Sequence, residues 1–96
     1  MNGYTFNWDD EKNTLNITKH GITFDEAATV FDDDDAIFIH DNNHSQYEER
    51  FSVIGFSERL RLLIVCHCYR NDDTVVRIIS ARKANKSEKL LYGGAK

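Results

Sequence analysis

The residues of this sequence best suited to chemistry are cations near its end. Arg77 interrupts an apolar run at 75–79, and Arg82 and Lys83 follow shortly after it. A guanidinium among apolar neighbours needs either a carboxylate partner or an anionic ligand. Arg82 and Lys83 also precede a predicted helix, and a helix N-terminus favours anions. The group is typical of a phosphate site, although a solvated basic edge with Arg77 paired to a glutamate is an equally open interpretation.

Further side chains in the second half could extend such a site along a nucleic acid. Tyr69 and Tyr92 supply aromatic faces on which bases could stack. The additional cations on either side of the apolar run are Arg50, Arg61, Lys86 and Lys89.

Cys66, His67 and Cys68 form a second candidate group, for which we considered a metal site. Alternate side chains of a strand point to opposite faces, so both cysteines face one way and His67 the other. The three side chains cannot converge on one ion, and no second cysteine pair completes a zinc site. We therefore interpret the cysteines as buried, inert thiols. His67 is either a structural residue or a general acid or base.

Charge is distributed unevenly along the chain, whose net charge is −4. Residues 1–49 carry twelve carboxylates and two lysines, a net −10, whereas residues 50–96 carry ten Lys or Arg and four carboxylates, a net +6. A polyanion responds to the local potential of the surface that it approaches. The asymmetry is compatible with a basic nucleic-acid face, and ion pairing between the halves is the alternative.

Length and composition predict one globular domain that spans residues 1–96. Hydrophobic residues make up 41% and charged residues 29%, which is typical of a folded domain. No apolar stretch approaches the roughly 20 residues that a membrane helix needs. The N-terminus lacks the pattern of a signal peptide, so we expect a cytoplasmic protein with reduced cysteines and no membrane partner.

The first part of the chain predicts a short strand and two helices. Residues 4–8 alternate weakly, and Asp9 or Asp10 suits the N-cap of a helix that ends at Gly21. Thr23 and Glu26 have the spacing of a capping box, and apolar residues at helical spacing follow to Phe31. The acidic run 32–35 is expected to be a solvated loop.

The remainder predicts a sheet and a final helix. Strands are expected at 36–40, 51–56, 60–69 and 74–81, and a short helix at 85–92. The tight connections favour an antiparallel meander. The predicted order is β-α-α-β-β-β-β-α, an α+β domain with helices on one face of the sheet.

Motifs along nearly the whole chain resemble those of the BrnT family of bacterial toxins. The segment Phe6–Asp9 with Lys12, Asn16 and Lys19-His20-Gly21 fits W-D-x-x-K-x-x-x-N-x-x-K-H-G. Other matching positions follow in the same order, and they are Phe24, Ala27, Ala28, 30–32, Asp41, His44, 48–50, Gly55, 77–84, Glu88 and Tyr92. The block R-I-I-S-A-R-K-A at 77–84 and the K-H-G motif are the most specific of these.

The resemblance implies a RelE-like fold and the toxin role in a type II toxin–antitoxin system. Such a toxin is an endoribonuclease that needs neither a metal nor another cofactor. Its cleavage of RNA inhibits translation as part of a stress response of the cell. A BrnA-like antitoxin with a ribbon-helix-helix domain would neutralise it, and the complex would repress its own operon, contacting operator DNA only through the antitoxin. The alternatives are a non-catalytic binding subunit of such a repressor and, least favoured, a small metalloprotein.

RNA cleavage without a metal needs a base for the 2′-hydroxyl, cationic stabilisation of the phosphate and an acid for the leaving oxygen. We assign the phosphate to Arg77 and Arg82, assisted by Lys83, with Arg50 next. His67, Glu49 or Tyr92 would transfer protons. The side chains expected to bind RNA without a catalytic role are Arg61, Lys86, Lys89, Lys19 and His20, although capping of the first helix suits Lys19 and His20 equally well.

Overall fold

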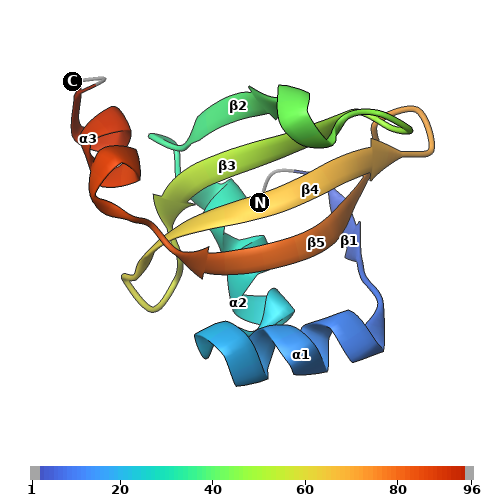
Figure 1. The fold of residues 1–96 in the computed structure, drawn as a ribbon, viewed down its shortest axis with the longest axis horizontal. Coiled ribbons are helices and arrows are strands. Elements are labelled where there is room, and N and C mark those ends of the chain that lie inside the picture. The colour runs from blue at the N-terminus through green and yellow to red at the C-terminus, as the bar shows by residue number, and fades with distance from the viewer. Residues whose placement is uncertain (1–2, 95–96) are drawn as a thin grey trace.

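The protein is described by a computed structural model that covers residues 3–94 (Figure 1). This part of the chain contains three helices and five strands, with 3₁₀ turns at Val30–Asp32 and Asn42–His44. In chain order they are β1 (Thr5–Asn7), α1 (Asp10–His20), α2 (Phe24–Thr29), β2 (Ile37–Asp41), β3 (Arg50–Phe56), β4 (Leu62–Arg70), β5 (Val75–Lys83) and α3 (Lys86–Gly94). The predicted α+β class is confirmed.

The strands form one sheet in the order β1-β5-β4-β3-β2. The last four strands make the predicted antiparallel meander, because each pairs with its neighbour along the chain. The prediction was incomplete for β1, which pairs with β5 in parallel and makes the sheet mixed. The N-terminal strand therefore lies beside the strand that carries Arg77 and Arg82.

Helix α1 begins and ends where the sequence indicates. The Asp9 carboxylate accepts hydrogen bonds from the amides of Glu11 (2.8 Å) and Lys12 (3.1 Å), so Asp9 is the N-cap. Gly21 ends the helix in the left-handed region, at φ 71°, and its amide donates to Ile17 O. The helix end places His20 at the margin of the sheet.

Only half of the predicted capping box forms at α2. Thr23 Oγ1 accepts from the Glu26 amide at 3.0 Å, but the Glu26 side chain turns away and binds Ser57 and Arg61. The acidic loop also differs from the prediction. Asp33 Oδ2 accepts hydrogen bonds from the Phe56 amide and the Tyr92 hydroxyl, both at 2.8 Å, and so joins β3 to α3.

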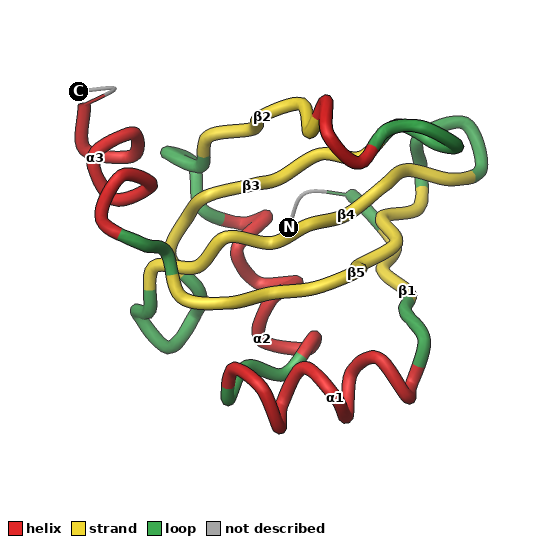
Figure 2. The backbone as a smooth tube through the Cα atoms, viewed as in Figure 1, coloured by secondary structure: helices red, strands yellow, loops and turns green. Residues whose placement is uncertain are grey.

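The core lies between the sheet and the layer formed by α1 and α2 (Figures 1 and 2). Fully buried side chains from both layers include Ile22, Phe24, Val53, Leu63 and Val65. Each such side chain contributes about 1.5–3 kcal/mol of folding free energy. The prediction of helices on one face is wrong for α3, which lies apart from α1 and α2 at the end of β3 and β5. Within residues 3–94 no helix has the length and apolar character needed to cross a membrane.

A bulge in β5 determines which side chains reach the open face of the sheet, the face that α1 and α2 leave uncovered. The register changes between Cys66↔Ser80 and His67↔Ile78, so Ile79 is one residue extra. In a regular strand, residues 77 and 82 point to opposite faces. Because Arg77 pairs with Cys68 and Arg82 with Ile64, the bulge brings both arginines to the same face.

Candidate active site

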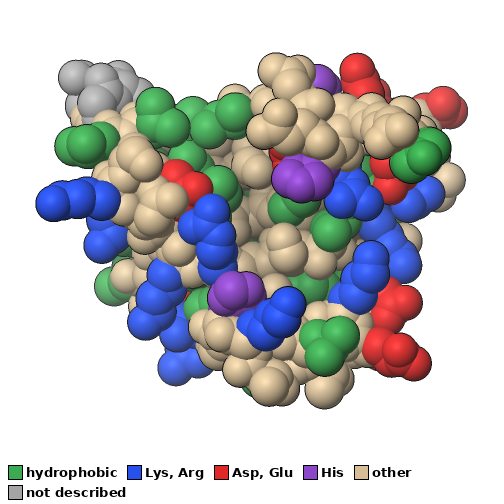
Figure 3. Space-filling model, viewed as in Figure 1, with side chains coloured by type: hydrophobic (Ala, Val, Ile, Leu, Met, Phe, Trp, Pro, Cys, Tyr) green, Lys and Arg blue, Asp and Glu red, His purple; other side chains and the backbone are tan. Residues whose placement is uncertain are grey.

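A hollow of about 370 Å³ opens on this face of the sheet. Its walls come from the end of α1, the β2–β3 connection and the three central strands. Lys and Arg side chains gather around it, with histidines on two sides (Figure 3). The lining residues are His20, Asp41, His44, Arg50, Ser52, Ile64, Cys66, Ile79, Ser80, Ala81 and Arg82.

A histidine–carboxylate pair forms one wall of the hollow. His44 Nδ1 lies 2.9 Å from Asp41 Oδ2. An ionised carboxylate can only accept, so Nδ1 donates to Asp41, and in the neutral form of the ring Nε2 is the acceptor. The Ser45 hydroxyl donates to Asp41 O (2.6 Å) and accepts from the Arg50 amide (3.0 Å), which closes the connection around the pair. The pair is therefore arranged as an oriented general base.

Arg50 lies beside this pair with an unsatisfied donor. Its Nε is buried and has no hydrogen-bond partner among residues 3–94. A buried charged donor without a partner is costly, and an anion in the hollow would remove that cost. Burial raises the pKa of the Cys66 thiol, and the charge of Arg50 opposes the rise. Cys66 is therefore a neutral thiol that adds no charge to the lining, and Arg50 supplies the positive charge of this wall.

Arg82 lies on the β5 side of the hollow and is already engaged. Its two terminal nitrogens bind both carboxylate oxygens of Glu88 at 2.8 and 2.9 Å. This pairing raises the pKa of Arg82 and lowers the pKa of Glu88. Glu88 also accepts from the Asn85 amide at the start of α3 (2.8 Å). The first turn of α3 thus holds the guanidinium at the margin of the hollow.

Arg77 is on the same face but outside the residues that line the hollow. Its Nη1 donates to Asn7 Oδ1 of β1 at 3.3 Å. None of the ion pairs within the described chain includes Arg77. The glutamate partner that the sequence left open is therefore absent from residues 3–94, and the cation faces solvent beside the hollow.

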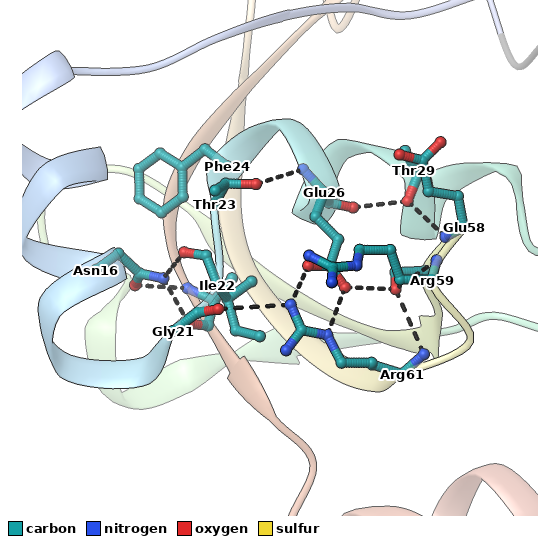
Figure 4. A network of polar contacts seen from close by, with 12 residues as sticks. Asn16, Gly21, Ile22, Thr23, Phe24, Glu26, Thr29, Glu58, Arg59 and Arg61 are labelled. Carbon is teal, nitrogen blue, oxygen red and sulfur yellow. Dashed lines mark hydrogen bonds and ion pairs between the residues drawn. The ribbon is translucent and has the colours of Figure 1, made fainter.

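His20 reaches the hollow because α1 is anchored to β5. Asn16 is 5% exposed, and its amide donates to Ile22 O (2.9 Å) and Ala81 O (2.8 Å) and accepts from the Ala81 amide (3.0 Å). Figure 4 shows the Asn16 side chain pointing from α1 toward Ile22. Lys19 is exposed at the same helix end but does not line the hollow.

Of the two roles that the sequence left open for His67, the structure supports the structural one, and the assignment to proton transfer is wrong. Its side chain does point away from the cysteines, but it is 0% exposed and packs in the core. Rings of Phe31, Phe38 and Phe51 surround it, and its nitrogens contact Val65 O (3.1 Å) and the Tyr69 hydroxyl (3.2 Å). Burial lowers the pKa of His67 to about 4, so the imidazole is neutral and structural at pH 7.

Two other predicted proton-transfer residues also lie away from the hollow. The Tyr92 hydroxyl donates to Asp33, and burial raises the pKa of Tyr92 to about 12. Glu49 lies 3.8 Å from His40 and lines a separate hollow with Tyr69. Neither side chain lines the hollow that contains His44 and Arg82.

A different, more apolar hollow beside α3 is lined by three of the cations that were predicted to contact RNA. They are Arg61, Lys83 and Lys89. Arg61 is tied to the buried Glu26 through Nε (2.9 Å) and Nη2, and Ser57 donates to the same carboxylate (Figure 4). This pairing lowers the pKa of Glu26 and raises that of Arg61. Arg61 therefore has a structural partner, whereas Lys86 and Lys89 are exposed on α3.

The sequence interpretation gave no role to several residues that the structure brings together. Asp41 and His44 belong to the matching motif positions, but their pairing depends on the 3₁₀ turn at Asn42–His44. The spacing of three residues between a histidine and an acid, between two predicted strands, was the available signal. Ser52 and Ser80 gave no signal of their own, because their place follows from strand register.

The chain is similar to known proteins in sequence and in fold. Residues 8–88 match the family described as "Ribonuclease toxin, BrnT, of type II toxin-antitoxin system". The crystal structure of the Brucella abortus ribonuclease toxin BrnT is similar, with a TM-score of 0.66 and 22% identity over 86% of this chain and 99% of that one. At this identity the likeness shows a shared fold. No curated protein matches the chain.

Proposed function

The chain belongs to the BrnT family of ribonuclease toxins of type II toxin–antitoxin systems, and we propose that it cleaves RNA in the hollow of the open sheet face. The observation that best supports this proposal is that one hollow contains both the unpartnered Arg50 Nε and the His44–Asp41 pair. A phosphate diester supplies the anion that Arg50 lacks, and it places the adjacent ribose near an imidazole. The RelE-like fold assignment is part of the same proposal.

The reaction divides between two histidines of the hollow. His44 Nε2 takes the proton of the 2′-hydroxyl while Asp41 holds the ring, and O2′ attacks the phosphorus. The bond from phosphorus to O5′ breaks, and His20 donates a proton to O5′. The products are a 2′,3′-cyclic phosphate and a 5′-hydroxyl. No metal ion enters these steps.

The arginines stabilise the charge that develops on the phosphate. Arg50 donates from inside the hollow, where an interaction with the transition state is stronger than in bulk water. Arg82 donates from the β5 side, and Arg77 binds a neighbouring phosphate along the strand. These roles keep the assignments of Arg50, Arg77 and Arg82 and replace His67, Glu49 and Tyr92 in proton transfer.

The family role adds a partner and a cellular consequence. A BrnA-like antitoxin with a ribbon-helix-helix domain binds the toxin, denies RNA access to the hollow and brings the complex to operator DNA. The complex represses its own operon, and free toxin arrests translation. The acidic first half of the chain, with a net charge of −10, supports docking of a basic partner.

The test is cleavage of a labelled single-stranded RNA by the purified, antitoxin-free chain in EDTA. We expect cleavage with 5′-hydroxyl and 2′,3′-cyclic phosphate ends. RNA binding without cleavage would instead support a non-catalytic subunit of a repressor complex. Cleavage that stops in EDTA would contradict the metal-free mechanism.

A further inference from the structure

A second hollow of about 370 Å³ continues from the first along the β2–β3 connection. The two share His44 and Arg50 in their walls. A polymer whose phosphate contacts Arg50 in the first hollow can therefore continue directly into the second. The remaining lining residues are Asn43, Gln46, Tyr47 and Glu48.

Tyr47 presents an aromatic ring to solvent in this second hollow. Its exposed fraction is 92%, the largest among the exposed large hydrophobic side chains of residues 3–94. Gln46 Nε2 donates to the Tyr47 hydroxyl at 3.5 Å, a contact at the edge of hydrogen-bonding range. A ring with both faces open is a platform on which an unpaired base can stack.

The neighbouring side chains suit the edge of a base. Asn43 and Gln46 each carry an amide, which offers both donors and an acceptor, as the Watson–Crick edges of nucleobases do. Glu48 is held by Arg70 at 3.2 Å, so its charge is partly compensated. The Ser45 hydroxyl bridges Asp41 and Arg50 and fixes the loop to the cleavage site.

We infer that this second hollow is a base-binding subsite for the nucleotide adjacent to the scissile phosphate. Tyr47 stacks on that base, and Asn43 and Gln46 contact its edge. The inference rests on the proposed RNA cleavage and adds a specificity-determining element to it. The ligand is single-stranded RNA, because a base within a duplex has neither face free for Tyr47.

The experiment measures binding of a 2′-O-methyl RNA, which cannot be cleaved at O2′, by fluorescence anisotropy. One abasic nucleotide is placed at each position in turn, and the cleavage point is mapped separately with unmodified RNA. The proteins are the wild type, Tyr47→Ala, Tyr47→Phe and the control Leu60→Ala. Leu60 is also an exposed apolar residue (82%), but it lies in the β3–β4 turn.

For the wild type we expect about tenfold weaker binding when the abasic nucleotide is next to the cleavage point. Tyr47→Ala should bind intact RNA about tenfold more weakly and lose its response to that abasic position. Tyr47→Phe should behave as wild type because it keeps the ring, and so should Leu60→Ala.

An unchanged abasic response in Tyr47→Ala would overturn the subsite while RNA cleavage by the wild type still stands. Conversely, coupling between Tyr47 and one base, with no cleavage of unmodified RNA, would support base binding by Tyr47 and refute the nuclease. If the wild type binds no RNA, both proposals fail.

Discussion

The environment of His67 makes one residue a determinant of stability in acid. Its folded-state pKa of about 4 is below the ordinary value of 6.5, because burial disfavours the charged ring. The unfolded chain therefore binds more protons between these pH values. The contribution of neutral His67 to the free energy of unfolding is fully present above about pH 6.5 and is lost as the pH falls toward 4.

We expect the free energy of unfolding to fall by about 2 kcal/mol between pH 7 and pH 5. His67→Leu should be less stable at pH 7, because Val65 O and the Tyr69 hydroxyl lose a partner, but should lose much less on acidification. Urea unfolding at both pH values measures the difference. Equal losses in the two proteins would refute this account.

At the scale of elements, the start of α3 restrains a cation of the site. The side chains of Glu88 and Asn85 each accept a hydrogen bond from the other residue's backbone amide at the helix start. The Glu88 carboxylate also accepts two hydrogen bonds from the Arg82 guanidinium. RNA must compete with Glu88 for the Arg82 guanidinium. The helix end thus limits how strongly the β5 side of the hollow binds phosphate.

Glu88→Gln removes the charge and keeps the hydrogen bonds of the helix start. We expect it to bind the 2′-O-methyl RNA about threefold more tightly, since a partly exposed ion pair contributes about 0.2–1 kcal/mol. Glu58→Gln is the matched control, because it removes one exposed carboxylate in the β3–β4 turn. Equal affinities of the two variants would show that Glu88 does not restrain Arg82.

Elements were easier to predict from sequence than the side chains that they bring together. Asp9, Gly21 and Thr23 marked the ends of α1 and α2 through local chemistry. The bulge at Ile79 has no such signal, because neither glycine nor proline marks it. Strand alternation alone would have separated Arg77 from Arg82. Long-range register also determines that His67 meets Phe31, Phe38 and Phe51 rather than the hollow.

At the scale of the whole molecule, the sheet separates two tasks. The face covered by α1 and α2 contains the core. On the open face Arg50 and Arg82 line the hollow and Arg77 lies outside its lining. Figure 3 shows further Lys and Arg side chains on the surface around them. The net charge of −4 does not indicate this arrangement, because it is the sum of an acidic first half and a basic second half. Local potential, not total charge, decides where RNA binds.

Proton transfer by His44 can be tested by comparing two histidines that lie four positions apart in the sequence. His44 lines the hollow, whereas His40 packs against Phe51 and lies outside its lining. The measurement is the single-turnover rate of RNA cleavage in EDTA by His44→Gln and His40→Gln. A cooperative thermal unfolding transition first shows that each variant is folded. We predict that His44→Gln is slower than wild type by about 10²-fold or more, with His40→Gln near the wild-type rate. Equal rates for the two variants would contradict the account.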